Sequence, residues 1–481
     1  MRLGQARVGG NVRELKPKRR WTRPLKWMGW GTVLVVLVLA AGRYGWGVYG
    51  DDVWARQVAP YTGAAKLLAD DASHPRVSPA EDAATDLVAA AKEIAADPRG
   101  NWILRDADSA TPLDDEQRVV AAGLIRRLDG VWAKLDAANG KTGANWHVDG
   151  DYERSLSQVD AITAFLRVAA QYYHQSGDDR RALACVRRVM RLAVIAGRAP
   201  DGYFEMTATY RSAARTVLQV AADLRVGTGD RAVSEADVRG LIAVMLDESE
   251  ARPSLIRDLE YRRAVVVDDS AQCLAERFPR IYRLPTIVHE PWARRLLRPM
   301  IQTDTPLMLR QADQVLAAAR LADDLPTLLS LAPDAGGLRV LREESMCLHL
   351  WAMTCWPQYE GNVRAHFATL VERRMAATAL ALRLYSIERG GGLPSRLDDL
   401  VPRWLLAVPG DPMAHGRTLS YRPKGRDPLL YSVGRDGIDD GGSEASPHAA
   451  WTADDGNWSR LWWQRDAVVH LRGPSAPNPI Q

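Results

Sequence analysis

Glycines and carboxylates alternate near the end of the chain in a pattern that favours a cation over a phosphate as ligand. The run "YSVGRDGIDDGG" places Asp436, Asp439 and Asp440 among four glycines. Glycine lets the backbone fold so that its carbonyl groups point inward, whereas three carboxylates would repel an anion. The other interpretation is a mobile acidic turn that binds nothing tightly, and the residues alone leave both interpretations open.

A second candidate group lies in "REESMCLHLW", where Glu344, Ser345 and His349 are close in sequence. Glu followed by Ser resembles the catalytic pair of lytic transglycosylases, although the aromatic and Gly-Leu-Gln segments of that family are missing. The other interpretation is an ordinary helix start, with Glu344 near the positive end of the helix dipole. The chain also has no G-x-S-x-G motif, Walker-type loop or dinucleotide-binding glycine motif. We therefore favour a non-enzymatic role and keep a carboxylate-dependent hydrolase as the alternative.

The cysteines do not have the spacing of a metal site. Cys185, Cys273, Cys347 and Cys355 form no C-x-x-C pair. Cys347 and Cys355 fall in one expected helix, where about 12 Å of rise separates them, too far for a disulfide. All four have apolar neighbours, which predicts buried free thiols. A disulfide between distant cysteines stays open in an oxidising compartment.

These candidate groups have to be positioned mainly by helices. Apolar residues recur every three or four positions from Val53 to about Ile387, which is the pattern of amphipathic helices. Breaks rich in Pro, Gly or Asp interrupt the pattern at irregular intervals. Besides the hairpin described next, helices are expected over residues 202–226, 234–249, 253–279, 305–323, 338–355 and 362–389.

One αα-hairpin is especially clear. Two apolar stripes cover residues 156–173 and 182–196, and Gly177 separates them. Gly177 suits the left-handed position after a helix, and Asp178 or Asp179 suits the N-cap of the next one. The hairpin resembles one tetratricopeptide repeat. Because no second copy occurs at a fixed period of about 34 residues, we expect an irregular array rather than a regular solenoid.

The N-terminal segment predicts a membrane anchor. Residues 1–26 contain nine Lys or Arg and one acid, a charge of +8 that leaves −4 for the rest of the chain. Because the body has no second basic patch, we expect no nucleic-acid partner. The apolar run over residues 27–49 meets the length of about 20 residues that a bilayer requires, and the positive-inside rule puts the N-terminus in the cytoplasm. The other interpretation is a cleaved signal peptide, with small residues at 40–42.

From about residue 361 the pattern changes to that of an α+β unit. A helix ends in "ALRLYSIERGG", "LDDLVP" and a "VPGDP" turn follow, and strands are expected at residues 418–422 and 429–433. With "YSVGRDG" and "ADDGNW", these motifs resemble the soluble part of the type II secretion major pseudopilin. The chain also resembles planctomycete-type membrane proteins that join a helical region to such a module. Trp462 and Trp463 are expected to pack back on the module, ahead of a Pro-rich tail.

The resemblance implies a calcium site. In the pseudopilin family this loop binds calcium, and the matching positions are the side chains of Asp436 and Asp454 and the backbone carbonyl of Val433. Calcium takes about six to eight oxygen ligands, so carboxylates and carbonyls suit it. The apolar segment lies more than three hundred residues before the module, whereas a pseudopilin joins the two directly. We therefore do not expect assembly into a pilus-like fibre.

Taken together, the sequence predicts a mainly α protein. Its parts are an N-terminal transmembrane helix, an irregular array of αα-hairpins outside the cytoplasm and a small α+β pseudopilin-like module. The expected boundaries are 1–26 (basic tail), 27–49 (transmembrane helix), 50–360 (helical domain), 361–460 (module) and 461–481 (tail). The expected function is that of a single-pass scaffold or interaction protein in the bacterial inner membrane. Its expected partners are the lipid bilayer and envelope proteins, with a link to secretion or surface structures.

Overall fold

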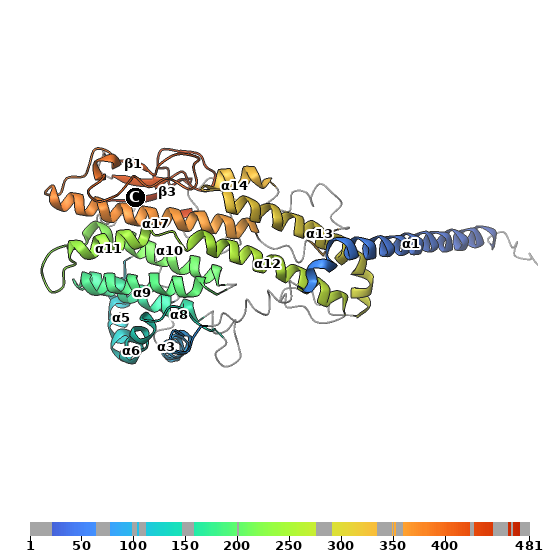
Figure 1. Cartoon of the computed structure of the whole chain (residues 1–481), viewed down its shortest axis with the longest axis horizontal. Coiled ribbons are helices and arrows are strands. Elements are labelled where there is room, and N and C mark those ends of the chain that lie inside the picture. The colour runs from blue at the N-terminus through green and yellow to red at the C-terminus, as the bar shows by residue number, and fades with distance from the viewer. Residues whose placement is uncertain are drawn as a thin grey trace, which may run out of the picture.

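The chain is mainly helical, with one small sheet near the C-terminus (Figure 1). The computed structural model describes residues 22–63, 77–98, 103–104, 112–146, 158–199, 202–275, 291–333, 349, 351–352, 359–423, 428–445, 460–462 and 465–471. The α-helices are α1 (Thr22–Gln57), α3 (Ala84–Ala96), α5 (Asp115–Arg127), α6 (Asp129–Asn139), α8 (Val159–Gln175), α9 (Asp179–Gly197), α10 (Tyr203–Val220), α11 (Glu235–Leu246), α12 (Ala251–Leu274), α13 (Pro291–Leu321), α14 (Leu325–Leu331) and α17 (Tyr359–Glu388). The predicted mainly α class is therefore confirmed.

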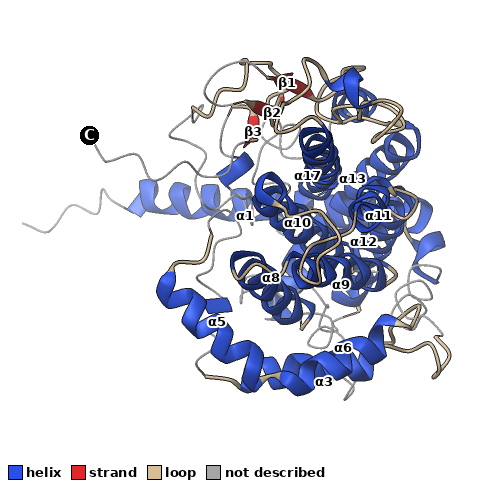
Figure 2. Ribbon diagram, turned by 90° about the vertical axis from the view of Figure 1, so that its left-hand side faces the viewer, coloured by secondary structure: helices blue, strands red, loops and turns tan. Residues whose placement is uncertain are grey.

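The helices of the body are stacked in layers (Figure 2). Helices α3, α5 and α6 form the outer layer on one side, α8 and α9 follow, and α10, α11 and α12 lie beyond them (Figures 1 and 2). Helix α17 comes next, and the sheet covers its far side. Because α17 has neighbours on both sides, apolar residues line it all round, as expected of a buried helix.

The predicted αα-hairpin is confirmed as α8 and α9. Gly177 has a φ of 84°, a left-handed conformation that a glycine adopts without strain. The carboxylate of Asp178 accepts a hydrogen bond from the backbone N–H of Arg181 at 3.1 Å and so caps α9. Asp179 is buried one residue later, where it contacts His174 at 2.6 Å and Arg225 at 2.9 Å. The turn is thus fixed both by its own backbone and by a neighbouring segment.

Helix α13 begins earlier than the sequence predicted. The expected helix covered residues 305–323, but α13 starts at Pro291 and contains two prolines in its interior. Pro299 has no N–H, so the carbonyl of Arg295 loses its partner within the helix. The guanidinium of Arg43 in α1 donates to that carbonyl at 2.6 Å. A contact from another helix therefore satisfies the carbonyl that the proline frees.

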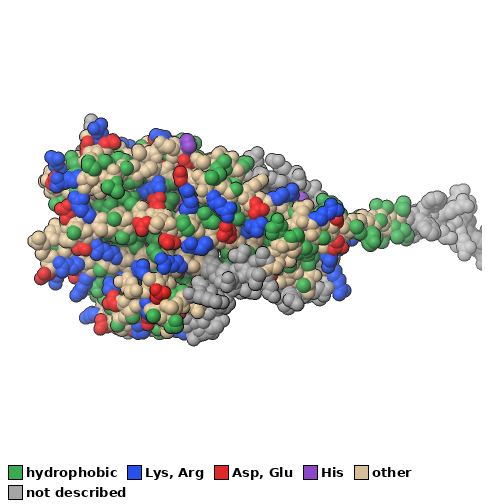
Figure 3. All heavy atoms as spheres, in the orientation of Figure 1, with side chains coloured by type: hydrophobic (Ala, Val, Ile, Leu, Met, Phe, Trp, Pro, Cys, Tyr) green, Lys and Arg blue, Asp and Glu red, His purple; other side chains and the backbone are tan. Residues whose placement is uncertain are grey.

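Helix α1 extends from outside the body into it (Figure 1). The apolar side chains of residues 33–39 are between 48% and 67% exposed, and hydrophobic side chains cover this part of the helix in the space-filling view (Figure 3). Within the described chain, residues 32–57 form the one helical stretch long and apolar enough to cross a membrane. The predicted N-terminal apolar helix is therefore present.

The sheet is antiparallel, with the strand order β1–β2–β3. Strands β1 (Ser420–Arg422) and β2 (Leu429–Ser432) lie within the two predicted strand segments. Strand β3 (Ala467–His470) pairs along its length with β2, although the sequence assigned these residues to the tail. The short helix η7 (Arg460–Trp462) precedes it, and Trp462 is fully buried as predicted. Trp463 lies outside the described residues.

The core is continuous from the helical body into the sheet. A single cluster of buried side chains includes Leu87 of α3, Phe165 of α8, Leu380 of α17 and Leu430 of β2. The boundary expected at residue 361 falls inside α17, which packs against α10 and α11 on one side and β2 on the other. The sheet is thus attached to the body through a shared helix.

Candidate functional site

The predicted calcium ligands are in different environments. Asp436 is exposed, and its carboxylate accepts a hydrogen bond from the N–H of Ile438 at 3.0 Å. Val433 is buried, and its N–H donates to Asp411 at 3.0 Å. Asp454 lies outside the described residues. Because Asp454 is outside the described part of the chain, the structure does not test the three-ligand site, and calcium binding stays a prediction.

The other acids of the loop already have partners. Asp439 accepts from the N–H of Gly441 at 3.0 Å and forms an ion pair with Arg417 at 2.8 Å. That N–H and the Arg417 guanidinium hold the pKa of Asp439 below its usual value against the opposing effect of burial. Asp440 forms an ion pair with Arg465 at 3.2 Å. Across the described residues, no group of three or more His, Cys, Asp or Glu is arranged to hold a metal ion.

Two buried carboxylates anchor this loop, and the sequence analysis did not find them. Asp466 is 0% exposed and accepts from the N–H groups of Gly442 at 2.8 Å and Ser443 at 2.9 Å. Asp411 accepts from Ser432 Oγ at 2.8 Å and from the N–H of Val433 at 3.0 Å. Burial raises the pKa of both carboxyl groups, although the N–H donors oppose the change. Asp411 lies in the "VPGDP" turn, a signal that could have been followed, whereas the sequence around Asp466 gives none.

Another candidate binding site lies between the helical body and the sheet region. This cavity, of about 480 Å³, is lined by α12, α17, residues 322–324 and residues 410–418, and we call it the seam cavity. Its volume falls within the range of about 300–1,000 Å³ that is usual for small-ligand pockets. It is positioned by the turn between α11 and α12, the turn between α13 and α14 and one face of α17.

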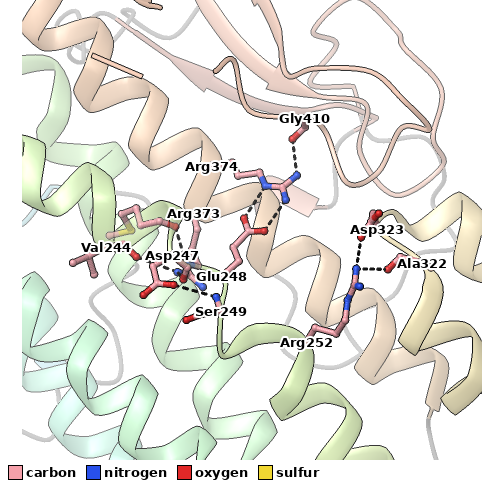
Figure 4. A network of polar contacts seen from close by, with 11 residues as sticks. Val244, Asp247, Glu248, Ser249, Arg252, Ala322, Asp323, Arg373, Arg374 and Gly410 are labelled. Carbon is pink, nitrogen blue, oxygen red and sulfur yellow. Dashed lines mark hydrogen bonds and ion pairs between the residues drawn. The ribbon is translucent and has the colours of Figure 1, made fainter. Parts of the chain in front are cut away.

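Arginines connect the walls of the seam cavity (Figure 4). Arg374 of α17 binds both carboxylate oxygens of Glu248 at 2.7 Å and donates to the carbonyl of Gly410 at 3.0 Å. Arg252 of α12 donates to the carbonyl of Ala322 at 2.9 Å and pairs with Asp323. Because a guanidinium presents several donors in a rigid fork, Arg374 fixes two other chain segments to α17, and Arg252 fixes the segment of Ala322 and Asp323 to α12.

The carboxylates that line the cavity are already neutralised by partners. Glu248 and Asp323 pair with arginines, and Asp324 accepts from the N–H of Thr327 at 2.7 Å and contacts His415 at 3.0 Å. Asp411 is occupied by the loop contacts described above. General acid–base catalysis needs a group free to exchange a proton with its substrate. The described lining therefore suits binding of a polar group better than acid–base chemistry.

His366 is a buried histidine in the lining of the seam cavity. It is 5% exposed. Its ring packs between Tyr203 at 6.3 Å and Phe367 at 5.1 Å. Burial, assisted by Arg252 and the two adjacent arginines of α17, lowers the pKa of His366 to about 3. At neutral pH the imidazole is therefore uncharged and offers one donor and one acceptor.

A buried ion cluster connects the body to the C-terminal region. Glu372 of α17 is 0% exposed and binds Arg215 of α10 at 2.9 Å through both carboxylate oxygens. Arg211 adds a bond at 3.1 Å, and the indole N–H of Trp462 donates at 2.5 Å. Burial alone would raise the pKa of Glu372, but the two guanidiniums and these bonds lower it below its usual value. Burial also lowers the pKa of Arg211 to about 10.

A second buried carboxylate lies at the end of the body near α1. Asp304 of α13 is 0% exposed, contacts His349 Nδ1 at 2.7 Å and accepts from the N–H of Ala352 at 3.0 Å. Burial is the main cause that raises the pKa of Asp304. Glu344 and Ser345, which the sequence analysis considered together with His349, lie outside the described residues.

The thiols agree with the sequence prediction where they are described. Cys185 and Cys273 are both buried, and neither is in a disulfide. Cys347 and Cys355 lie outside the described residues.

No family model matches this chain, and neither a curated protein nor a solved structure shows significant similarity to it. The function therefore has to be inferred from the residues and their contacts.

Proposed function

We propose that this protein is a single-pass, membrane-anchored protein of the bacterial envelope that acts as a non-enzymatic interaction or scaffold protein. The observation that carries the proposal is α1, whose apolar residues 33–39 are exposed and which continues without a break into the helical body. Exposed apolar side chains around a whole helix are unfavourable in water and favourable in lipid. The lipid bilayer is thus the first partner of the chain.

The charge distribution supports one orientation. The +8 charge of residues 1–26 precedes the apolar helix, whereas the remaining chain carries −4. By the positive-inside rule, the basic tail stays in the cytoplasm and the body lies on the opposite side of the inner membrane.

The C-terminal region acts, in this proposal, as a pseudopilin-like module linked to secretion or surface structures. The motif resemblance supports this, together with an antiparallel sheet packed on the helix that precedes it. The module is a fixed domain of the body rather than a filament subunit. A pseudopilin uses its N-terminal helix to pack a filament core, but the helix before this sheet, α17, is buried between α10, α11 and β2.

Envelope partners dock, in this proposal, at the seam cavity. The reasons are the volume of the cavity, the ion pairs among its lining residues and the uncharged imidazole of His366, which together suit a neutral polar group such as a peptide backbone. A ligand that forms a hydrogen bond with this imidazole gains affinity.

Site-specific photo-cross-linking in intact membranes tests this proposal. A photoreactive amino acid replaces Thr418, an exposed lining residue of the cavity, in one variant and Val119, which is 74% exposed on α5, in the control. We expect discrete adducts of defined mass from position 418 that His366→Phe abolishes. Adducts that are equal from positions 418 and 119, or that are insensitive to His366→Phe, contradict docking at the cavity.

The second candidate function is a membrane-anchored envelope hydrolase with a carboxylate in the helical domain. The buried pair of Asp304 and His349 favours it, because a carboxylate that binds one nitrogen of an imidazole orients the ring as a general base. The test is release of soluble fragments from isolated cell wall by the full-length protein and by Asp304→Asn. Release that the substitution abolishes supports the hydrolase, and no release by the unmodified protein removes it.

A further inference from the structure

Helix α1 is held rigidly against α13 rather than attached through a flexible linker. Arg43 donates to the carbonyl of Arg295 at 2.6 Å, and Asp51 accepts from Gln302 at 2.6 Å and from Arg298 at 3.1 Å. Between these contacts Trp46 packs against a buried cluster of α12 and α13 side chains. The two helices are thus joined by polar contacts on both sides of an apolar one.

Gly50 allows this close approach. A Cβ atom at this position would lie 2.8 Å from the side-chain oxygen of Gln302 and 3.3 Å from the Cα of Pro299. The second distance involves backbone, which cannot move aside as a flexible side chain can. A larger residue at position 50 would therefore separate α1 from α13. Gly42, about two turns earlier, has nothing within 4 Å of such a Cβ atom.

The contact between α1 and α13 lies at a defined level relative to the bilayer if α1 crosses the membrane. In this respect the inference rests on the proposed function. A hydrocarbon layer of about 30 Å corresponds to about 20 helical residues, so a span that starts at Trp27 ends close to Trp46. Arg295, which is bonded to Arg43, then lies at the level of the lipid headgroups. The far end of α13, at Leu321, lies about 39 Å from Arg295 along the helix axis.

The surface at this level has the composition of a membrane interface. Tyr44 is 75% exposed, Tyr49 is 61% exposed and Leu296 is 57% exposed. Arg295 and Arg298 are exposed beside them. Aromatic rings and cations are the side chains that occupy the headgroup layer, where phosphates accept from guanidinium groups.

We propose that residues 295–298 of α13 and the adjoining residues 43–49 of α1 form one headgroup-binding surface. Phospholipid phosphates of the extracytoplasmic leaflet are its ligands. Because α1 is fixed to α13, this surface sets the body at a constant tilt against the membrane. The body is thereby presented to envelope partners in one orientation instead of moving freely on a tether.

Lipid quenching of fluorescence tests the proposal in the full-length protein, reconstituted in vesicles of phosphatidylethanolamine and phosphatidylglycerol. A fluorescent non-canonical amino acid replaces Leu296, Leu321 or Val36 in separate variants, and nitroxides are placed on either the lipid headgroup or the acyl chain. Leu321 is the matched control, because it lies on the same helix and is 71% exposed. We expect headgroup nitroxides to quench position 296 several-fold more than position 321, and acyl-chain nitroxides to quench position 36.

The outcomes separate this inference from the proposed anchoring. Equal quenching at positions 296 and 321, with strong acyl-chain quenching at position 36, overturns the headgroup surface and leaves the anchor intact. No quenching at position 36 overturns the anchor itself. Gly50→Leu should reduce quenching at position 296 without changing position 36, and Gly42→Leu should change neither. Quenching at position 296 that is unaffected by Gly50→Leu overturns the rigid α1–α13 coupling.

Discussion

Replacement of Glu372 by Gln should destabilise the protein more than any surface charge change. The substitution keeps the shape of the side chain but removes its charge, so Arg211 and Arg215 stay buried without their counter-ion. The side chains of these arginines are only 8% and 18% exposed, and water can therefore replace the carboxylate only in part. In addition, the new amide N–H₂ group would face guanidinium donors.

The expected loss in the free energy of unfolding follows from the burial of the two arginines. Breaking a buried ion pair by removing one partner costs about 3–5 kcal/mol, because an uncompensated charge remains. Loss of the charge-assisted bond from Trp462 falls within this figure. At a urea dependence of about 3 kcal/mol per M, the upper end for small proteins, the unfolding midpoint should fall by about 1–2 M.

The assay is urea unfolding of the full-length protein in detergent, with Glu235→Gln as the control. Glu235 forms an exposed pair with Arg239 at 2.8 Å, four residues along the same helix. Such surface pairs contribute about 0.3–0.5 kcal/mol, so the control should leave the midpoint nearly unchanged. Equal midpoints for the two variants would refute the reasoning.

The difference between the parent protein and Glu372→Gln should also depend on pH. The pKa of Glu372 is lowered in the folded state. Its stabilisation is therefore complete above the pKa of an unfolded glutamate, about 4.3, and is lost as the pH falls through the folded value. The two midpoints should converge below about pH 4.3. Midpoints of the two proteins that converge as the pH is raised would contradict this prediction.

Three further predictions concern the loop and the thiols. Gly434→Ala should destabilise the fold clearly more than Gly441→Ala, because both have a φ of 73° but only a Cβ at 434 would clash, at 2.0 Å, with the carbonyl of Arg465; equal urea midpoints contradict this. Cys185 should react with iodoacetamide only after unfolding, because burial raises its pKa to about 12; native alkylation as fast as in urea, seen by mass spectrometry, contradicts it. Calcium should raise the melting temperature relative to EGTA, and Asp436→Asn should remove the shift; an unchanged midpoint in the parent protein excludes the site.

Local patterns allowed several parts of the fold to be predicted. The α8–α9 hairpin follows from two apolar stripes with Gly177 and Asp178 between them, because the conformation of that turn depends on adjacent residues. Strands β1 and β2 follow from short β-prone runs between turns. The N-terminal helix follows from hydrophobicity alone.

The features that the sequence did not predict depend on contacts between residues that are far apart in sequence. Strand β3 has only four residues and is followed by a Pro-rich segment, and its pairing with β2 is what defines it. Arg43, which donates to the carbonyl of Arg295 that Pro299 leaves without a helical partner, is 252 residues away from it. The partner of Glu372 on α10 is likewise 161 residues away. No local pattern encodes such pairs.

The seam cavity could not be predicted for the same reason. Its walls come from four separate segments, and Arg374 connects two of them by binding Glu248 and the carbonyl of Gly410. His366 lies in an ordinary helical pattern, and the burial and neighbouring arginines that lower its pKa come together only in the assembled fold.

Protease accessibility in spheroplasts tests the central claim most directly. With an epitope tag on the N-terminal tail of the full-length protein, external protease should degrade the body and leave a membrane-bound, tagged fragment of about the first 50 residues. Breaking the inner membrane with detergent should expose the tag as well. A body that stays intact until detergent is added, or a protein that washes off the membrane with alkaline carbonate, would contradict an extracytoplasmic protein anchored by α1.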